Sequence, residues 1–214
     1  MIRPQPEQAW ALGLAMGLAV EILGLVIFLG AHVFVTRRNE RAALVARLGE
    51  WPYRGLFSLV ALIGLGLIVY GFAQYRASGL IQIWNPPAWT RHIVIVLMWP
   101  ASILIAAAYV PGNIKKTLKH PLLVAVKTWA FAHLCANGDL GGIILFGSVL
   151  AWGVYDRISL KYRTDPGGPP IPYGGTRNDI IAIIVGTIIY LALGLVFHPI
   201  VIGLPAFGTA AFGL

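Results

Sequence analysis

Long, nearly uncharged apolar runs dominate this chain and limit the folds open to it. An α-helix rises about 1.5 Å per residue, so roughly 20 apolar residues cross a bilayer core of about 30 Å. Backbone groups in lipid must bond to one another, which a helix achieves within one segment. We therefore expect an all-α fold, a polytopic transmembrane bundle of about six helices. The spans are predicted at roughly 10–36, 55–75, 93–110, 122–137, 140–155 and 180–204.

Composition indicates that the bilayer is the main solvent. Of the 214 residues, 58% are hydrophobic and 11% are charged, whereas a soluble domain carries roughly 25% charged residues. The spans leave little length for anything else, so residues 1–214 are expected to form a single integral membrane domain. The first apolar run continues from Trp10 to Val35 without a convincing small-residue cleavage site, which indicates a retained helix rather than a signal peptide.

The net charge of +8 is distributed as a topology signal. A nucleic-acid site would be a basic face with interleaved aromatics on a soluble module. Here Lys and Arg lie between apolar spans, so no nucleic-acid partner is expected. Cytoplasmic connections carry an excess of Lys and Arg, and twelve of the sixteen lie at 37–54, 111–121 and 156–179. These three connections are expected in the cytoplasm, with both termini outside.

Three other connections have a distinctive composition. The fourth and fifth spans are short, and residues 137–139 between them are expected to form the tip of a hairpin near the outer interface. Segment 84–89 has two prolines and two tryptophans, which exclude a helix interior and favour headgroup depth. The stretch from Asp165 to Gly175 contains four prolines and four glycines and is expected to be a cytoplasmic linker.

Motifs for soluble-enzyme chemistry are absent from the sequence. It contains no G-x-S-x-G, P-loop or H-E-x-x-H pattern. The single cysteine, Cys135, excludes an intrachain disulfide and a cysteine-only metal site, and there is no C-x-x-C-H run for covalent haem attachment. Any haem would therefore be held without covalent bonds to the chain.

Ionisable residues inside predicted spans are the candidate site residues, because charge at membrane depth is costly. Glu21 and His32 are eleven residues apart, which places them within about 20° on one helix face with Leu25 and Phe28 between them. This stripe is expected to face the bundle interior. The alternative is a neutral, hydrogen-bonded Glu21 and an interfacial His32.

The remaining candidates lie in the fourth and sixth spans. His133 is thirteen residues beyond His120, at a depth where an imidazole needs water, a carboxylate or a metal as its partner. Lys127 either extends its ammonium to the cytoplasmic interface or pairs with an anion. His198 precedes Pro199 near the outer end of the last span, where a role at the helix end is expected.

The chain resembles the NnrU family in an ordered set of short motifs over nearly its whole length. These are Leu29-Gly30-Ala31-His32, Arg47-Leu48-Gly49-Glu50 through Tyr53-Arg54, Lys119-His120-Pro121, Trp129-Ala130-Phe131-Ala132-His133, Asn137-Gly138-Asp139 and Phe197-His198-Pro199. The resemblance implies a multi-pass protein of the bacterial inner membrane, linked to denitrification through nitrite and nitric oxide reduction. Respiratory or denitrification membrane proteins would be its partners beside the lipid bilayer.

The family's plant relative, the 15-cis-zeta-carotene isomerase, is a haem b protein with an axial histidine in each of two helices. Carried over by motif, the iron ligands would be His32 and His133. Helical depth allows this pair if the porphyrin lies nearly parallel to the membrane, whereas an upright ring favours His133 with His198. The plant isomerase has a cysteine where this chain has Ala130, and Cys135 lies about 160° from His133 around the helix, so ligand-switching isomerisation is not expected.

Three functions follow from these patterns. The first is a haem b protein that supports nitrogen-oxide metabolism by electron transfer, redox sensing or assembly. The second is a haem-dependent cis–trans isomerase of a lipophilic polyene. The third is a non-catalytic membrane factor whose histidines bond neighbouring helices. Lys119-His120-Pro121 is also similar to a motif of membrane methyltransferases, but the chain has no Glu after Glu50 to supply their paired glutamates.

Overall fold

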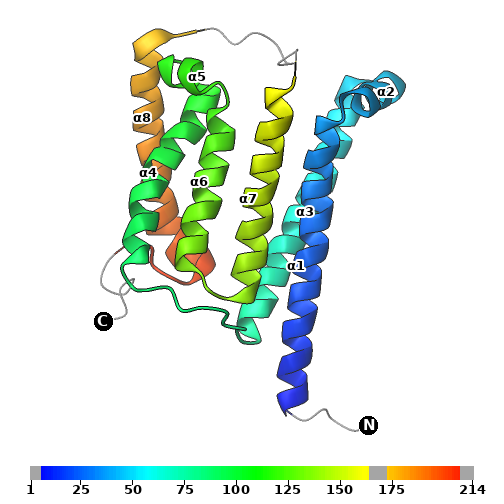
Figure 1. Cartoon of the computed structure of the whole chain (residues 1–214), viewed down its shortest axis with the longest axis vertical. Helices are drawn as coiled ribbons and strands as arrows, with labels where there is room; N and C mark the ends of the chain where they lie inside the picture. Colours follow the sequence, from blue (N-terminus) through cyan, green and yellow to red (C-terminus); the bar gives the residue numbers. More distant parts are fainter. Residues whose placement is uncertain (1–5, 164–172, 208–214) are drawn as a thin grey trace. The chain divides into compact units, whose positions relative to one another are not determined.

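The computed structural model describes residues 6–163 and 173–207, with side chains from Trp10 onward. These residues form eight α-helices and one π-helix (Figure 1). Apart from one isolated backbone bridge between Gln82 and Asp139, no strand pairing occurs among them. The predicted all-α class is confirmed. The elements are α1 (Pro6–Thr36), α2 (Arg38–Leu48), α3 (Glu50–Ala77), α4 (Thr90–Tyr109), α5 (Asn113–Leu118), α6 (Pro121–Ala136), α7 (Leu140–Lys161), α8 (Gly175–Ala192) and η1 (Leu193–Ile202).

Five helical stretches of the described chain are long and apolar enough to cross a membrane. They are α1 from Trp10, α3, α4, α7, and α8 continued by η1, and α6 is a shorter apolar helix. The predicted multi-pass helical bundle is confirmed. The predicted short fourth span is confirmed as α6, which has 16 residues. The prediction of a short fifth span, which corresponds to α7, is wrong. α7 continues to Lys161 over 22 residues, because residues 156–161 are mostly polar but contain no glycine or proline to end the helix.

Two helices lie inside segments that the sequence indicated only as polar connections. α2 occupies most of 37–54 and has no buried residue, and the six-residue α5 lies within 111–121. Gly49 separates α2 from α3 with φ of 87°, a conformation that suits glycine. Both were missed because a polar, exposed helix lacks the apolar periodicity that marks a helix in a sequence.

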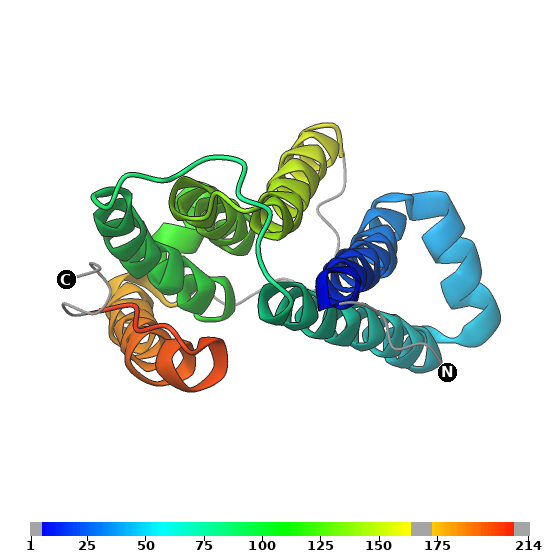
Figure 2. The ribbon, with the colours of Figure 1, turned by 90° about the horizontal axis from the view of Figure 1, so that it is seen from below.

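α1 and α3 form a close antiparallel pair (Figures 1 and 2). Glycines alternate between the two helices along the contact. A side-chain β-carbon at Gly24 would lie 2.5 Å from the Ile68 nitrogen, and one at Gly64 would lie 2.7 Å from the Phe28 nitrogen. Small residues permit this close approach of the two backbones. Lipid supplies no hydrophobic drive that could hold the helices together if the close packing were lost.

α4 packs against both α6 and α8. Its buried residues at these contacts are small, including Ala101, Ser102 and Ala106. Gly186 of α8 lies against the backbone of Ile103, where a β-carbon would come within 2.4 to 2.7 Å of main-chain atoms, and Ala182 is fully buried beside it along α8. Close packing of small residues therefore holds these three helices together.

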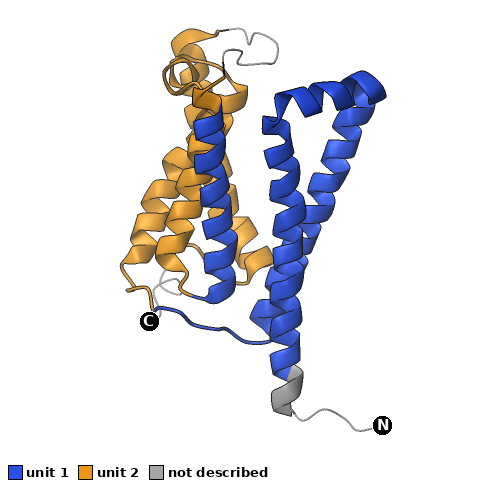
Figure 3. Ribbon diagram, turned by 45° about the vertical axis from the view of Figure 1, so that its right-hand side comes forward, with its two compact units in different colours: residues 1–84, 139–159 blue, residues 85–138, 160–214 orange. Residues whose placement is uncertain are grey.

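The chain divides into two compact units, coloured in Figure 3. Unit 1 comprises residues 1–84 and 139–159, and unit 2 comprises 85–138 and 160–214. Residues 137–139 therefore link a helix of unit 2 to a helix of unit 1. Segment 84–89 is irregular up to the start of α4, as its prolines predict. Most of the predicted linker, residues 165–172, lies outside the described residues.

We predict that Gly71→Leu destabilises the α1–α3 pair, because a β-carbon at Gly71 would collide with the backbone of α1 at Glu21. Overpacking of this kind costs about 1–3 kcal/mol, which lowers the melting temperature of a chain this size by several degrees. Thermal unfolding of the purified protein in detergent measures it. Gly66→Leu on the same helix is the control, since nothing lies within 4 Å of its added carbon. Equal melting temperatures for the two variants would contradict the packing assignment.

Candidate functional site

A buried carboxyl group lies at the centre of unit 1. Glu21 of α1 is 0% exposed, and neither carboxyl oxygen has a hydrogen-bond partner among the described residues. The ring of Tyr75 on α3 and the backbone of Gly141 on α7 enclose it. A β-carbon at Gly141 would lie 3.2 Å from Glu21 Oε2 and 2.6 Å from the Tyr75 ring. Glycine at position 141 therefore makes room for the carboxyl and the phenol.

An ion pair lies beside this carboxyl. Arg76 of α3 donates to Asp139 Oδ2 over 2.7 Å, and Asp139 Oδ1 accepts the Gly142 N–H over 2.9 Å, which caps the start of α7. The Asp139 carboxylate is almost fully buried, and the side chain of Arg76 is 28% exposed. Tyr75 completes the arrangement by accepting the Ile81 N–H over 3.0 Å. These residues, Glu21, Tyr75, Arg76 and Asp139, are named the carboxyl cluster.

His32 lies eleven residues further along α1 in an aromatic environment. Its ring centroid is 4.3 Å from Phe28, 5.3 Å from Phe57 of α3 and 5.4 Å from Trp152 of α7. Nδ1 donates to the Phe28 carbonyl over 2.7 Å. The contacts of Glu21 and His32 with α3 and α7 confirm that the predicted stripe faces the interior of its unit.

Unit 2 brings two imidazoles together. The ring centroids of His133 in α6 and His198 in η1 are 6.3 Å apart, with ring planes inclined by 34°. His133 Nδ1 donates to the Trp129 carbonyl over 2.8 Å, which fixes the ring orientation and the tautomer. The sequence indicated both histidines separately, and His133 was predicted to need a partner at this depth.

The π-helix determines where His198 lies. Pro199 inside η1 has no N–H to donate, and the wider turn from Leu193 to Ile202 accommodates it. The helix ends at Gly203, which adopts the left-handed conformation with φ of 76°. Single π-type turns are frequent at functional sites. His198 lies within η1, four residues before its end, and its ring lies beside that of His133.

The other sequence candidates do not join these groups. His120 occupies the N-cap position of α6, where its carbonyl accepts the Val124 N–H over 3.2 Å. Lys127 is half-buried on α6. Ala130 is fully buried, and Cys135 is half-buried near the end of the same helix. His32 belongs to unit 1, and His133 and His198 belong to unit 2.

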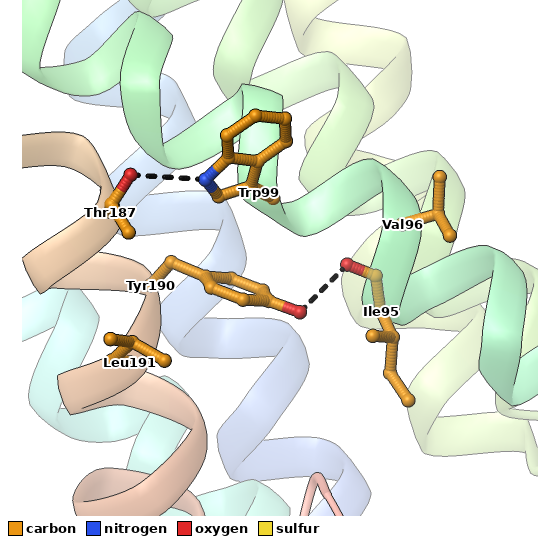
Figure 4. A pocket seen from close by; sticks show the side chains of 6 residues that line it. All are labelled: Ile95, Val96, Trp99, Thr187, Tyr190 and Leu191. Carbon is orange, nitrogen blue, oxygen red and sulfur yellow. Dashed lines mark hydrogen bonds between the residues drawn. The ribbon is translucent and has the colours of Figure 1, made fainter. Parts of the chain in front are cut away.

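A groove of about 380 Å³ runs between α4 and α8 of unit 2 (Figure 4). Its polar atoms are already bonded: Trp99 Nε1 donates to Thr187 over 3.1 Å, and Tyr190 donates to the Ile95 carbonyl over 3.1 Å. Val96 and Leu191 complete the lining. The groove therefore presents an apolar surface suited to a hydrocarbon chain.

Sequence reasoning missed Asp139, Arg76, Tyr75 and Trp152. Asp139 was noted only in the hairpin tip and the Asn137-Gly138-Asp139 motif, and Arg76 was not singled out. Nothing in a single sequence pairs two such residues 63 positions apart. A helix-capping signal was present, because Asp139 directly precedes the apolar run of α7.

Together, the fold and these groups define a polytopic α-helical membrane protein with ionisable side chains buried at membrane depth. The family model described as NnrU protein matches residues 20–206, and the chain belongs to this family. No curated protein and no solved structure matches the chain.

We predict that Asp139→Ala lowers the unfolding free energy by about 3 kcal/mol, because it removes the helix cap and the largely buried Arg76–Asp139 ion pair. Asp139→Asn keeps an oxygen for the Gly142 N–H and should lose about 1 kcal/mol less. Chemical or thermal unfolding of the purified variants measures both. Glu40→Ala, which removes an exposed carboxylate 3.9 Å from Arg37, should change stability by less than about 0.5 kcal/mol. An unfolding free energy lower for Asp139→Asn than for Asp139→Ala would contradict this account.

Proposed function

We propose that this NnrU-family protein binds haem b in the inner membrane of a bacterium and supports nitrite and nitric oxide reduction by electron transfer, redox sensing or assembly. The approach of His133 and His198 in unit 2 carries the haem assignment. The link to nitrogen oxides rests on the family resemblance described above. His133 and His198 would hold the haem iron, which would supply one-electron redox chemistry.

The separation of the two imidazoles fits a common iron. A metal–nitrogen bond is about 2 Å, so two imidazoles that bound one metal ion would have their ring centroids about 6 Å apart. The observed centroid separation is 6.3 Å. The Trp129 carbonyl holds His133 Nδ1, the type of outer contact that orients a metal-binding histidine.

The number of donors also favours a porphyrin over a bare ion. Among the described residues no group of three or more His, Cys, Asp or Glu side chains is placed to hold a metal. Two imidazoles suffice when a porphyrin provides the other four nitrogens. The family resemblance pairs His133 with His32 instead, so His133 is common to both assignments and the second ligand distinguishes them.

We predict that His133→Ala lowers the haem-to-protein ratio by more than about tenfold, since even outer-shell contacts of a metal ligand contribute about 10–100-fold in affinity. His198→Ala should leave a five-coordinate, high-spin haem with reduced retention, and His32→Ala should keep the parental spectrum. Absorption spectra of oxidised and reduced protein, with a pyridine haemochrome assay, measure all three.

His92→Ala, at the exposed start of α4, is the control and should keep full haem content. Loss of the low-spin spectrum in His32→Ala but not in His198→Ala would assign the second ligand to His32. A purified parental protein without haem, or His133→Ala with an unchanged Soret band, would overturn the haem proposal and favour a non-catalytic membrane factor.

A second candidate function, cis–trans isomerisation of a lipophilic polyene, is favoured by the apolar groove between α4 and α8. If a polyene occupies it, Leu191→Trp should fill the groove and lower turnover about tenfold or more. The assay is conversion of a cis-polyene by the reduced, haem-loaded protein in reconstituted membranes. Leu195→Trp, exposed one turn further along the same segment, is the control. Absence of turnover in the parental protein would exclude this function.

A further inference from the structure

The carboxyl cluster of unit 1 takes no part in the haem proposal and has its own chemistry. Glu21 is completely buried and has two unpartnered oxygens among the described contacts. Ionisable groups at membrane depth are rare, and those retained there commonly mark pathways for ions or protons. An unpaired carboxylate in this position would cost several kcal/mol.

The charges around Glu21 are unbalanced by one. Three elements face it: α1 supplies Glu21 itself, α3 supplies Tyr75 and Arg76, and the start of α7 supplies Asp139. Arg76 and Asp139 are the charged groups that act on the Glu21 carboxyl. The guanidinium is committed to Asp139 over 2.7 Å. Two carboxyls thus share one cation, and one of them must carry a proton for the cluster to be neutral.

The space around Glu21 limits the ligand to something very small. A β-carbon at Gly141 would lie 2.6 Å from the Tyr75 ring and 3.2 Å from Glu21 Oε2, and one at Gly71 would lie 2.3 Å from the Glu21 backbone nitrogen, so neither position has room for a methyl group. A metal ion needs several oxygen or nitrogen ligands, and no three suitable side chains converge among the described residues. A proton is the cation that this site has the space and the donor atoms to hold.

The cluster also has a more open end. The Glu21 side chain is fully buried, whereas that of Arg76 is 28% exposed beside Asp139. Asp139 lies at the start of α7, where the helix dipole stabilises negative charge. Proton exchange with water would therefore pass through the Arg76–Asp139 pair.

We propose that Glu21 and Asp139 form a proton-binding site that holds one exchangeable proton. In the starting state, Glu21 carries the proton and Asp139 is the carboxylate paired with Arg76. Exchange breaks the Glu21 O–H bond and forms an O–H bond on Asp139, and Arg76 then pairs with the newly ionised Glu21. The count of protons and charges is unchanged by the transfer, and Asp139 exchanges the proton with water.

Infrared difference spectroscopy of the full chain in lipid nanodiscs tests this site directly. The parental protein should show the carbonyl band of a protonated carboxylic acid, and the band should shift after transfer to D₂O. Glu21→Gln should remove it. Asp139→Asn should also remove it, because Glu21 is then the carboxyl that balances the charge of Arg76 and is ionised. Glu40→Gln, on the exposed face of α2, should leave it unchanged.

Each contrary result overturns the proposal. Absence of a protonated-acid band in the parental protein would show that Glu21 is ionised. A band that fails to shift in D₂O would show that the proton does not exchange. A band that survives in Asp139→Asn would show that Glu21 stays protonated even when Asp139 no longer balances the charge of Arg76. Glu21 would then be a permanently neutral acid with a structural role. The D₂O measurement needs no variant, so it remains decisive if Glu21→Gln does not fold.

All residues of this site belong to unit 1, so its test is separate from that of the haem. A protein without haem can still show the exchangeable band, and a haem-loaded protein can lack it.

Discussion

The close approach of α1 and α3 is the contact on which the rest of unit 1 depends. Lipid provides little hydrophobic drive for helices to associate, so they adhere through backbone proximity and van der Waals contact. Gly17 lies against the backbone of Tyr75, and Gly71 lies against the backbone of Glu21. The glycines that pair the helices thereby fix the carboxyl and the phenol at the same level. Packing and polar chemistry in this unit have one structural origin.

The two units concentrate different chemistry. In unit 1, carboxyls and a guanidinium meet around the first turn of α7. In unit 2, the imidazoles of α6 and η1 meet, with ring centroids 6.3 Å apart. An imidazole stays neutral more readily than a carboxylate in an apolar environment. Unit 2 is accordingly suited to metal ligation and unit 1 to holding a proton.

The sequence was sufficient for features that depend on a single helix. The apolar spans and the shared face of Glu21 and His32 follow from helix length and periodicity. It was insufficient where two helices must meet. The pairing of His133 with His198 depends on α4 packing against both α6 and α8, and the pairing of Arg76 with Asp139 depends on α7 beginning beside the end of α3. The end of α7 was also missed, because the charged residues Asp156 and Arg157 end the apolar run without ending the helix.

In the proposed haem site, the residues of α6 favour coordination by fixed imidazoles over an exchange of iron ligands. Ala130 is fully buried and has no donor atom. Cys135 is two residues beyond His133 and so projects from a different side of the helix. His133 is then the only residue of α6 suited to the iron, and a second ligand must come from another element. An iron held by two imidazoles has no open position for a substrate, which favours electron transfer or sensing over catalysis at the metal.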